Sequence, residues 1–232
     1  MDLTRISFPV CICQPRSLLE NITDYFAHWD LLSEAARTDD PYQRMRLVTE
    51  WYVSGFSKAM KVVRKPYNPI IGEVYRCMWV GPTGSKTHFV AEQVSHHPPI
   101  SAFYLSNRED GWAASGTIAF SVSFYGLSAW AYLNGVQSIR LFKYNEEYRW
   151  GFPPTKASGF FIGPFIMEMG GVMTIRCETN PFSTELDFKL QGMFSSADLY
   201  RVQGKIVKDG KTVDTIDGKY FETVRINKDV FF

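Results

Sequence analysis

The feature that most constrains the fold of this chain is a series of short segments, from about residue 72 onward, in which apolar and polar residues alternate. About ten such segments follow one another, and turn-forming stretches such as GPTGS, LNGV and KDGK separate several of them. The segments are EVYRCMWV, THFVAEQV, ASGTIAFSVSFYG, SAWAYL, QSIRLFKY, FFIGPFIMEM, VMTIRCE, TELDFKL, YRVQGKIV and KTVDTI. Because no helical pattern lies between these strands, antiparallel connections are expected, and the pattern predicts a barrel or a sandwich.

The residues before this series have a different periodicity. Residues 17–59 are predicted to be helical, with Ser17 and Glu20 spaced as in a capping box, and with a second helix start at Asp40 followed by Pro41. We interpret the apolar stripes of these helices as packing surfaces rather than ligand sites. Residues 1–16 alternate apolar side chains with two prolines, which is consistent with an edge strand or with a mobile flap that has one apolar face.

Composition narrows the class of protein. Hydrophobic residues make up 45% and aromatic residues 16% of the chain, enough to fill a core or to line a cavity. The net charge of +1 argues against a nucleic-acid binder. The four cysteines fit neither a disulfide framework nor a zinc site, and the chain has neither a signal-peptide pattern nor an apolar run of about 18 residues. We therefore expect a cytoplasmic, globular protein with reduced thiols.

Two segments carry the polar chemistry. In the first, RKPYNPIIGE, two prolines bracket Asn68 and stiffen the loop that presents Lys65 and Asn68. The second, EQVSHHPPIS, places His96 and His97 side by side before two prolines, as at a strand end or a kink. A cation, an amide and two imidazoles are hydrogen-bond donors suited to phosphate oxygens.

Other interpretations of these segments remain open on the residues alone. Composition alone favours, for the first segment, a stiff connector that has exposed polar groups. A metal site would need a third ligand, and a catalytic Ser95–His96 pair lacks a nucleophile elbow. Adjacent residues of a strand point to opposite faces, so both histidines reach one phosphate only if the Pro-Pro segment distorts the strand.

The two segments resemble a known family. EQVSHHPPISAF is similar to the signature of the oxysterol-binding protein family, and KPYNPIIGE is similar to that family's second shared segment. The runs DLTRISFPVCICQPRSLL and PYNPIIGEVYRCMW, with RMRLV and WYVSGF, resemble the subgroup that exchanges phosphatidylserine for phosphatidylinositol 4-phosphate. The resemblance extends over nearly the whole chain.

The resemblance implies a mainly β fold with N-terminal helices, in which an incomplete antiparallel β-barrel encloses a lipid tunnel. It implies one domain over residues 1–232, with a lid at about 1–16, helices at about 17–59 and the barrel at about 70–232. Matched position by position, Lys65, Asn68, His96 and His97 bind the lipid headgroup. The lid covers the lipid with an apolar face that consists of Leu3, Ile6, Phe8, Val10 and Ile12.

The implied function is that of a carrier that exchanges phosphatidylserine, or a related phospholipid, for phosphatidylinositol 4-phosphate between membranes. Such a protein needs no cofactor, no metal and no catalytic residue, and it contacts membranes peripherally, at endoplasmic reticulum contact sites. The alternatives are a sterol/phosphatidylinositol 4-phosphate exchanger, a lipid-sensing scaffold and, third, a lipid-modifying enzyme. The resemblance also implies a C-terminal segment that completes the headgroup site, and these residues end at Phe232 before it.

Overall fold

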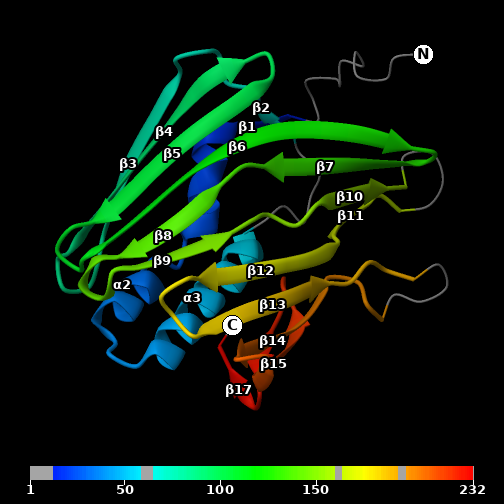
Figure 1. The fold of residues 1–232 in the computed structure, drawn as a ribbon. Helices are drawn as coiled ribbons and strands as arrows, with labels where there is room; N and C mark the ends of the chain where they lie inside the picture. The colour runs from blue at the N-terminus through cyan, green and yellow to red at the C-terminus, as the bar shows by residue number, and fades with distance from the viewer. Residues whose placement is uncertain (1–12, 59–64, 160–163, 193–196, 232) are drawn as a thin grey trace.

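The computed structural model describes residues 13–58, 65–159, 164–192 and 197–231 (Figure 1). The side chains of Cys13 and Lys65 lie outside this description. So do the predicted lid residues Leu3, Ile6, Phe8, Val10 and Ile12.

Helices form within the predicted range 17–59, but they are divided into five separate elements among the described residues. They are α1 (Leu18–Asn21), the 3-10 helix η3 (Ile22–Phe26), α2 (Asp30–Arg37), α3 (Pro41–Gly55) and the 3-10 helix η4 (Phe56–Lys58). The predicted start of α3 is confirmed, because the Asp40 side chain accepts a hydrogen bond from the Tyr42 amide at 3.0 Å and Pro41 is the first helical residue. No helix among the described residues is both long and apolar enough to cross a bilayer.

The predicted capping box at Ser17 is wrong. Ser17 precedes α1 in an extended conformation, yet its side chain makes no capping hydrogen bond. Its hydroxyl instead donates to Glu73 Oε1 at 2.6 Å, a residue far along the chain. A charged acceptor makes a stronger hydrogen bond than a neutral one, which explains why the four-residue helix α1 loses its cap.

Nearly all the described strands belong to one antiparallel sheet, and only β1 (Cys13–Ser17) and β2 (Lys65–Tyr67) form a separate, parallel pair. Residues 13–16 of the predicted lid are therefore part of a strand. The strands of the large sheet are β3 (Val74–Val80), β4 (Lys86–His96), β5 (Pro99–Asn107), β6 (Trp112–Tyr125), β7 (Ser128–Asn134), β8 (Gln137–Leu141), β9 (Glu146–Trp150), β10 (Thr155–Ser158), β11 (Ile166–Met169), β12 (Gly171–Cys177), β13 (Phe182–Phe188), β14 (Arg201–Lys208), β15 (Lys211–Lys219), β16 (Val224–Ile226) and β17 (Asp229–Val230).

The sheet curves around the helices without closing. The long strand β6 pairs with β5 and β8 along its first half and with β7 along its second half, so it joins two parts of the sheet. The ladder between β9 and β12 contains only the pairs Tyr148–Cys177 and Arg149–Arg176, and beyond these the two strands separate. The predicted fold class, mainly antiparallel β with N-terminal helices and an incomplete barrel, is confirmed.

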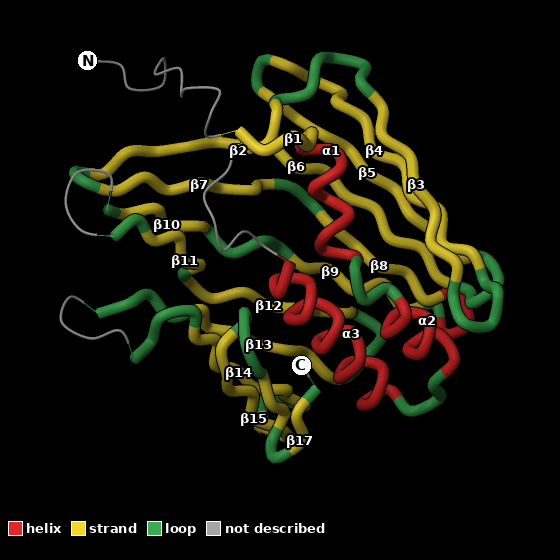
Figure 2. Tube along the Cα trace, turned by 180° about the vertical axis from the view of Figure 1, so that it is seen from behind, coloured by secondary structure: helices red, strands yellow, loops and turns green. Residues whose placement is uncertain are grey.

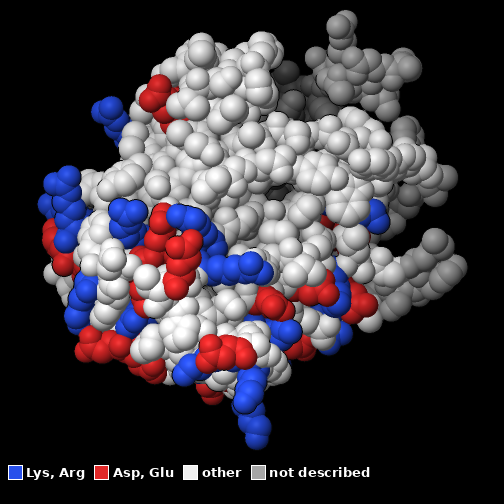
Figure 3. All heavy atoms as spheres, viewed as in Figure 1, with Lys and Arg blue, Asp and Glu red and all other residues white. Residues whose placement is uncertain are grey.

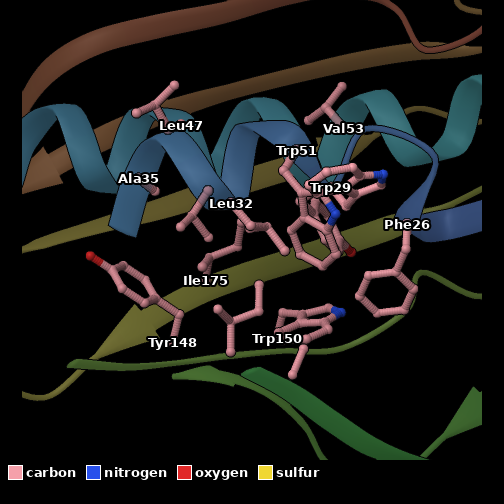
Figure 4. Packing of buried hydrophobic residues seen from close by; sticks show 14 of the residues in the cluster. Phe26, Trp29, Leu32, Ala35, Leu47, Trp51, Val53, Tyr148, Trp150 and Ile175 are labelled. Carbon is pink, nitrogen blue, oxygen red and sulfur yellow. The ribbon is translucent and has the colours of Figure 1, made fainter. Parts of the chain in front are cut away.

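The helices lie along one face of this sheet and form the core with it, as the view from behind shows (Figure 2). Side chains from α2 and α3 point toward side chains from β9 and β12 (Figure 4). Trp51 of α3 meets Trp150 of β9 edge to face, with ring centroids 5.1 Å apart, and Phe26 lies against Trp51 at 5.4 Å. Burial of each large apolar side chain contributes about 1.5–3 kcal/mol, so this interface stabilises the packing of the helices on the sheet.

A buried ion pair attaches the start of α3 to β9. Arg44 is 5% exposed, and its guanidinium donates to both carboxylate oxygens of Glu146, at 2.8 and 2.7 Å. The hydrogen bond to Glu146 raises the pKa of the Arg44 guanidinium. The hydroxyl of Tyr148 and the amide of Asn180 also donate to the Glu146 carboxylate. The buried charges are thus paired and hydrogen-bonded, as their desolvation requires.

Candidate functional site

The two histidines lie at the tip of the hairpin between β4 and β5. His96 pairs with Pro99, and His97 and Pro98, joined by a cis peptide bond, form the turn. The chain reverses direction at this turn, so the two rings do not point to opposite faces of a strand. Their centroids are 4.8 Å apart, with the ring planes at 69°. The turn thus distorts the strand in the way that brings the two imidazole rings close together.

The KPYNP segment reaches the same end of the sheet. The Nδ1 atom of His96 lies 3.2 Å from the carbonyl oxygen of Pro69. Backbone hydrogen bonds join the Gly72 amide to the Gln93 carbonyl at 2.9 Å and the Gln93 amide to the Glu73 carbonyl at 3.0 Å. These bonds extend the β3–β4 ladder beyond its last paired strand residues. The two segments that the sequence singles out are thus neighbours, close to β1 and β2 at the upper end of the sheet (Figure 1).

The carboxylate of Glu73 holds the loop in place. Its Oε2 atom accepts a hydrogen bond from the Ile70 amide at 3.2 Å, and its Oε1 atom accepts the Ser17 hydroxyl at 2.6 Å. Pro69 is buried, whereas Asn68 is exposed. The backbone of Lys65 pairs with Cys13 in the parallel β1–β2 ladder. Asn68, His96 and His97 are therefore brought to one rim, and the backbone of Lys65 enters the same loop.

The contact between His96 and Pro69 fixes which ring nitrogen carries the hydrogen. The carbonyl of Pro69 can only accept, so His96 Nδ1 is the donor in that contact. The other ring nitrogen, Nε2, is left for a contact outside the described residues.

Arg16, the next cation along β1, is already paired. Its guanidinium donates to Asp24 at 2.7 and 3.0 Å and to Glu20 at 2.8 Å. The hydrogen bond with Asp24 raises the pKa of the Arg16 guanidinium. These contacts fix the junction of β1 with α1 and neutralise the charge of Arg16. Arg16 is therefore committed to these contacts, and the assignment of Lys65 as the cation of the rim stays a prediction.

Three residues near the rim were not among the predicted site residues. Ser17 and Glu73 are joined by the hydrogen bond described above. They lie 56 residues apart, so no local pattern in the sequence predicts this bond. Gln93 is fully buried behind the loop; its side-chain oxygen accepts the Ser101 hydroxyl, while Nε2 has no hydrogen-bond partner among the described residues. An unpaired buried amide costs about 1–3 kcal/mol, so Gln93 is a polar position at which a water or a ligand group would be stabilised.

Two hollows lie elsewhere in the molecule. An open hollow of about 920 Å³ occupies the place where β9 and β12 separate, and it is lined by Arg140, Arg149, Arg176, Trp150 and Met173 among others. Glu147 lies 3.1 Å from Arg149 and 3.8 Å from Arg140, so much of this positive charge is paired. A second, apolar cavity of about 10 Å³ between the helices and Trp150 is far too small for a lipid.

Nothing in the described ranges gathers three or more side chains suited to metal binding. An antiparallel sheet wrapped around helices, with hydrogen-bond donors at one rim, defines a barrel-type binding domain. The profile of the family described as Oxysterol-binding protein matches residues 1–230. The chain belongs to the oxysterol-binding protein family, whose members are lipid-binding and lipid-transfer proteins.

Three members of this family show how similar the chain is to its relatives and how much of each relative it covers. The chain is 46% identical over 231 residues to mouse oxysterol-binding protein-related protein 5, a match that covers 99% of this chain and 26% of the relative. It is 43% identical to mouse oxysterol-binding protein-related protein 8, over 98% of this chain and 26% of that protein. It is 40% identical to oxysterol-binding protein 4 of Dictyostelium discoideum, over 97% of this chain and 48% of the relative. The chain thus spans about a quarter to a half of these relatives.

Solved structures share the fold. The Osh1 ORD domain in complex with ergosterol is similar with a TM-score of 0.84 and 28% identity, covering 97% of this chain and 52% of that one. The Osh3 ORD from Saccharomyces cerevisiae in complex with PI(4)P has the same TM-score of 0.84 at 23% identity, covering 100% and 62%. The second similarity establishes the fold alone.

Proposed function

We propose that this chain is a lipid-transfer domain that exchanges phosphatidylserine, or a related phospholipid, for phosphatidylinositol 4-phosphate between membranes. The observation that carries the proposal is the contact of 3.2 Å between His96 Nδ1 and the Pro69 carbonyl, which joins the two polar segments at one rim. Lys65, Asn68, His96 and His97 supply the donors that a monoester phosphate requires. In this proposal they bind the 4-phosphate.

The roles that we propose for the tunnel and the lid follow from the low solubility of acyl chains in water. Each methylene exposed to water costs about 0.8 kcal/mol, so a carrier must cover the acyl chains throughout the transfer. In the proposed domain, spanning residues 1–232, a tunnel holds the acyl chains and the lid residues Leu3, Ile6, Phe8, Val10 and Ile12 cover them. The chain makes and breaks no covalent bond and needs no cofactor. It works in the cytoplasm at membrane surfaces, at endoplasmic reticulum contact sites.

The second lipid is a separate part of the proposal. The resemblance of the N-terminal run and of PYNPIIGEVYRCMW to the phosphatidylserine-exchanging subgroup supports phosphatidylserine. The similarity to the Osh1 ORD domain, solved with ergosterol and with cholesterol, supports a sterol as the second candidate. A scaffold that senses its lipid without moving it would use the same rim.

Transfer between vesicles tests the proposal. Donor vesicles contain phosphatidylserine, acceptor vesicles contain phosphatidylinositol 4-phosphate, and the purified chain is added while both lipids are followed. We expect counter-transport, with phosphatidylserine moving faster when the phosphoinositide gradient is present. Movement of a sterol in place of phosphatidylserine would favour the second candidate. Binding of phosphatidylinositol 4-phosphate without transfer would favour the scaffold, and absence of binding would contradict the proposal.

Native mass spectrometry tests the stoichiometry of the same domain. If the two lipids compete for one tunnel, the chain carries either lipid at unit occupancy and never both. A species with both lipids bound would contradict exchange by competition.

A further inference from the structure

Two consecutive isoleucines project from the candidate rim. Ile70 is 69% exposed and Ile71 is 66% exposed, on the turn that leads from the KPYNP loop into β3. Tyr67 and Val94, each about half exposed, lie on the two chain segments next to this turn. Single exposed aliphatic side chains are common, but an adjacent pair beside further exposed apolar groups marks an interaction surface.

The turn that carries the pair is rigid. The Ile70 amide donates to the Glu73 carboxylate at 3.2 Å, and the Glu73 amide donates to the Ile70 carbonyl at 3.0 Å. Gly72, with φ of +78°, completes the turn and donates its amide to Gln93 at 2.9 Å. Because the backbone is already ordered, inserting the two side chains into another phase requires little additional ordering of the chain.

Charged side chains are distributed unevenly over the face of the molecule that Figure 3 shows. Figure 3 shows Lys, Arg, Asp and Glu gathered over the lower part, where α2, β8, β9 and β12 to β15 lie, while the upper part is largely uncharged. Residues 111–139 contain no charged residue at all. Glu73, next to the isoleucines, is hydrogen-bonded to Ser17 and Ile70. The end that carries Ile70 and Ile71 is therefore suited to contact with the polar–apolar boundary of a bilayer.

We propose that Ile70 and Ile71 form a membrane-insertion tip: their side chains enter the acyl–headgroup boundary of a lipid bilayer. Insertion places Asn68, His96 and His97 at headgroup level. A phosphorylated headgroup then meets its donors while its acyl chains are still in the bilayer. The identity of that headgroup rests on the proposed function, but insertion of the tip does not.

The test compares a tip variant with a matched control. Ile70→Ser/Ile71→Ser removes two exposed apolar side chains from the tip. Val136→Ser/Val172→Ser removes two that are 69% and 61% exposed, in the turn between β7 and β8 and in β12. Partition is measured by co-sedimentation with phosphatidylcholine vesicles that contain phosphatidylserine. We expect the tip variant to bind about tenfold or more weakly, and the control to bind like the parent. Equal losses in the two variants, or no loss in the tip variant, would overturn the proposal.

A direct measurement complements the variants. Ile71→Trp is expected to gain fluorescence that lipids brominated near the headgroup quench, while Val136→Trp gains fluorescence that they do not quench. Absence of quenching at position 71 would overturn insertion. If gel filtration shows a dimer that the Ser variant dissociates, the tip joins two copies of the chain, and the proposal is also wrong.

Binding of a short-chain, water-soluble phosphatidylinositol 4-phosphate separates the two proposals. The tip variant is expected to retain it, because the rim donors are intact. Loss of this binding in the tip variant but not in the parent would mean that the isoleucines belong to the ligand site and would overturn the insertion tip. If the parent itself does not bind the short-chain lipid, only the proposed function is contradicted. The partition onto vesicles would still decide the role of the tip.

Discussion

The Ser17 hydroxyl donates a hydrogen bond of 2.6 Å to Oε1 of Glu73, and this bond joins the end of β1 to the loop that presents Asn68. The other oxygen of the same carboxylate accepts the Ile70 amide. One carboxylate thus connects β1, which contains the last residues of the predicted lid, with the candidate headgroup loop. The end of β1 and the loop are therefore held together at this carboxylate.

The first prediction concerns this connection. Ser17→Ala is expected to leave the barrel folded and to speed hydrogen exchange at the Ile70 amide. Loss of one hydrogen bond to a charged group costs about 1.5–3 kcal/mol locally, so exchange should accelerate by about tenfold or more. Thr23→Ala, which removes a hydroxyl hydrogen bond to the Glu20 carbonyl, is the control and should leave the Ile70 amide unaffected. Unchanged exchange in Ser17→Ala would show that the bond does not order the loop.

The second prediction concerns three of the four predicted headgroup residues, namely Lys65, His96 and His97. Lys65→Ala and His96→Ala/His97→Ala are expected to lose uptake of phosphatidylinositol 4-phosphate, because each removes donors to the phosphate. The melting temperature should remain close to that of the parent, since His97 is exposed and His96 lies at the sheet end. Lys86→Ala, at an exposed position at the far end of β4, is the control. A folded variant that still takes up the lipid would contradict the assignment.

The third prediction concerns the tautomer of His96. Because Nδ1 donates to the Pro69 carbonyl, the neutral ring should carry its hydrogen on Nδ1, with Nε2 as an acceptor. Nitrogen-15 chemical shifts of the imidazole measure the tautomer of the neutral ring. Shifts typical of a hydrogen on Nε2 would contradict the contact with Pro69.

The fourth prediction concerns the buried pair Arg44–Glu146. Arg44→Met leaves Glu146, which is 3% exposed, without its cation, and should lower the free energy of unfolding by about 3–5 kcal/mol. The matched control is Arg149→Met, whose exposed side chain pairs with Glu147 at 3.1 Å and should cost at most about 1 kcal/mol. Urea unfolding of both variants checks the difference. Equal losses would mean that the Arg44–Glu146 pair contributes no more than a surface pair.

The fifth prediction follows from the buried phenol of Tyr52, which donates to the Gly151 carbonyl at 2.6 Å. Burial raises the pKa of the Tyr52 hydroxyl well above 10.0, and the charge of Tyr25 adds to the effect. In the unfolded chain the phenol ionises at about pH 10, whereas in the folded chain it stays neutral. Its contribution to stability is thus complete below about pH 10 and is lost as the pH rises toward its folded-state pKa.

Urea unfolding at several alkaline pH values measures this loss. Tyr52→Phe should be less stable than the parent at neutral pH by about 1 kcal/mol, because the Gly151 carbonyl loses its partner. Above about pH 10 the free energy of unfolding of Tyr52→Phe should fall less steeply with pH than that of the parent. The two slopes should differ by up to about 1.4 kcal/mol per pH unit. Parallel pH profiles for parent and variant would contradict the assignment.

Local chemistry explains which elements the sequence predicts correctly. Asp40 and Pro41 start α3 because capping depends on neighbouring residues only. Ser17 fails as a cap because Glu73, whose position depends on the whole fold, takes its hydroxyl. The alternation pattern does not include Pro99–Asn107, yet β5 forms there, since the two prolines mark a hairpin turn rather than the end of a strand series.

The candidate site is predictable in its parts but not in its assembly. Both polar segments stand out in the sequence through their prolines and donors. Their contact through Pro69 and His96 depends on the β3–β4 register, which a pattern of alternation does not define. The role of Glu73 is likewise invisible until β1 is placed beside the loop.

The order of pairing in the sheet has a consequence for biosynthesis. From β4 to β7 each strand pairs with the strand that precedes it in the chain, and all the contacts that define the rim lie between residues 13 and 107. Pairings between neighbours in sequence have low contact order and form early. On a ribosome, where the N-terminal part emerges first, the candidate rim can therefore be assembled while the strands from β8 onward are still being synthesised.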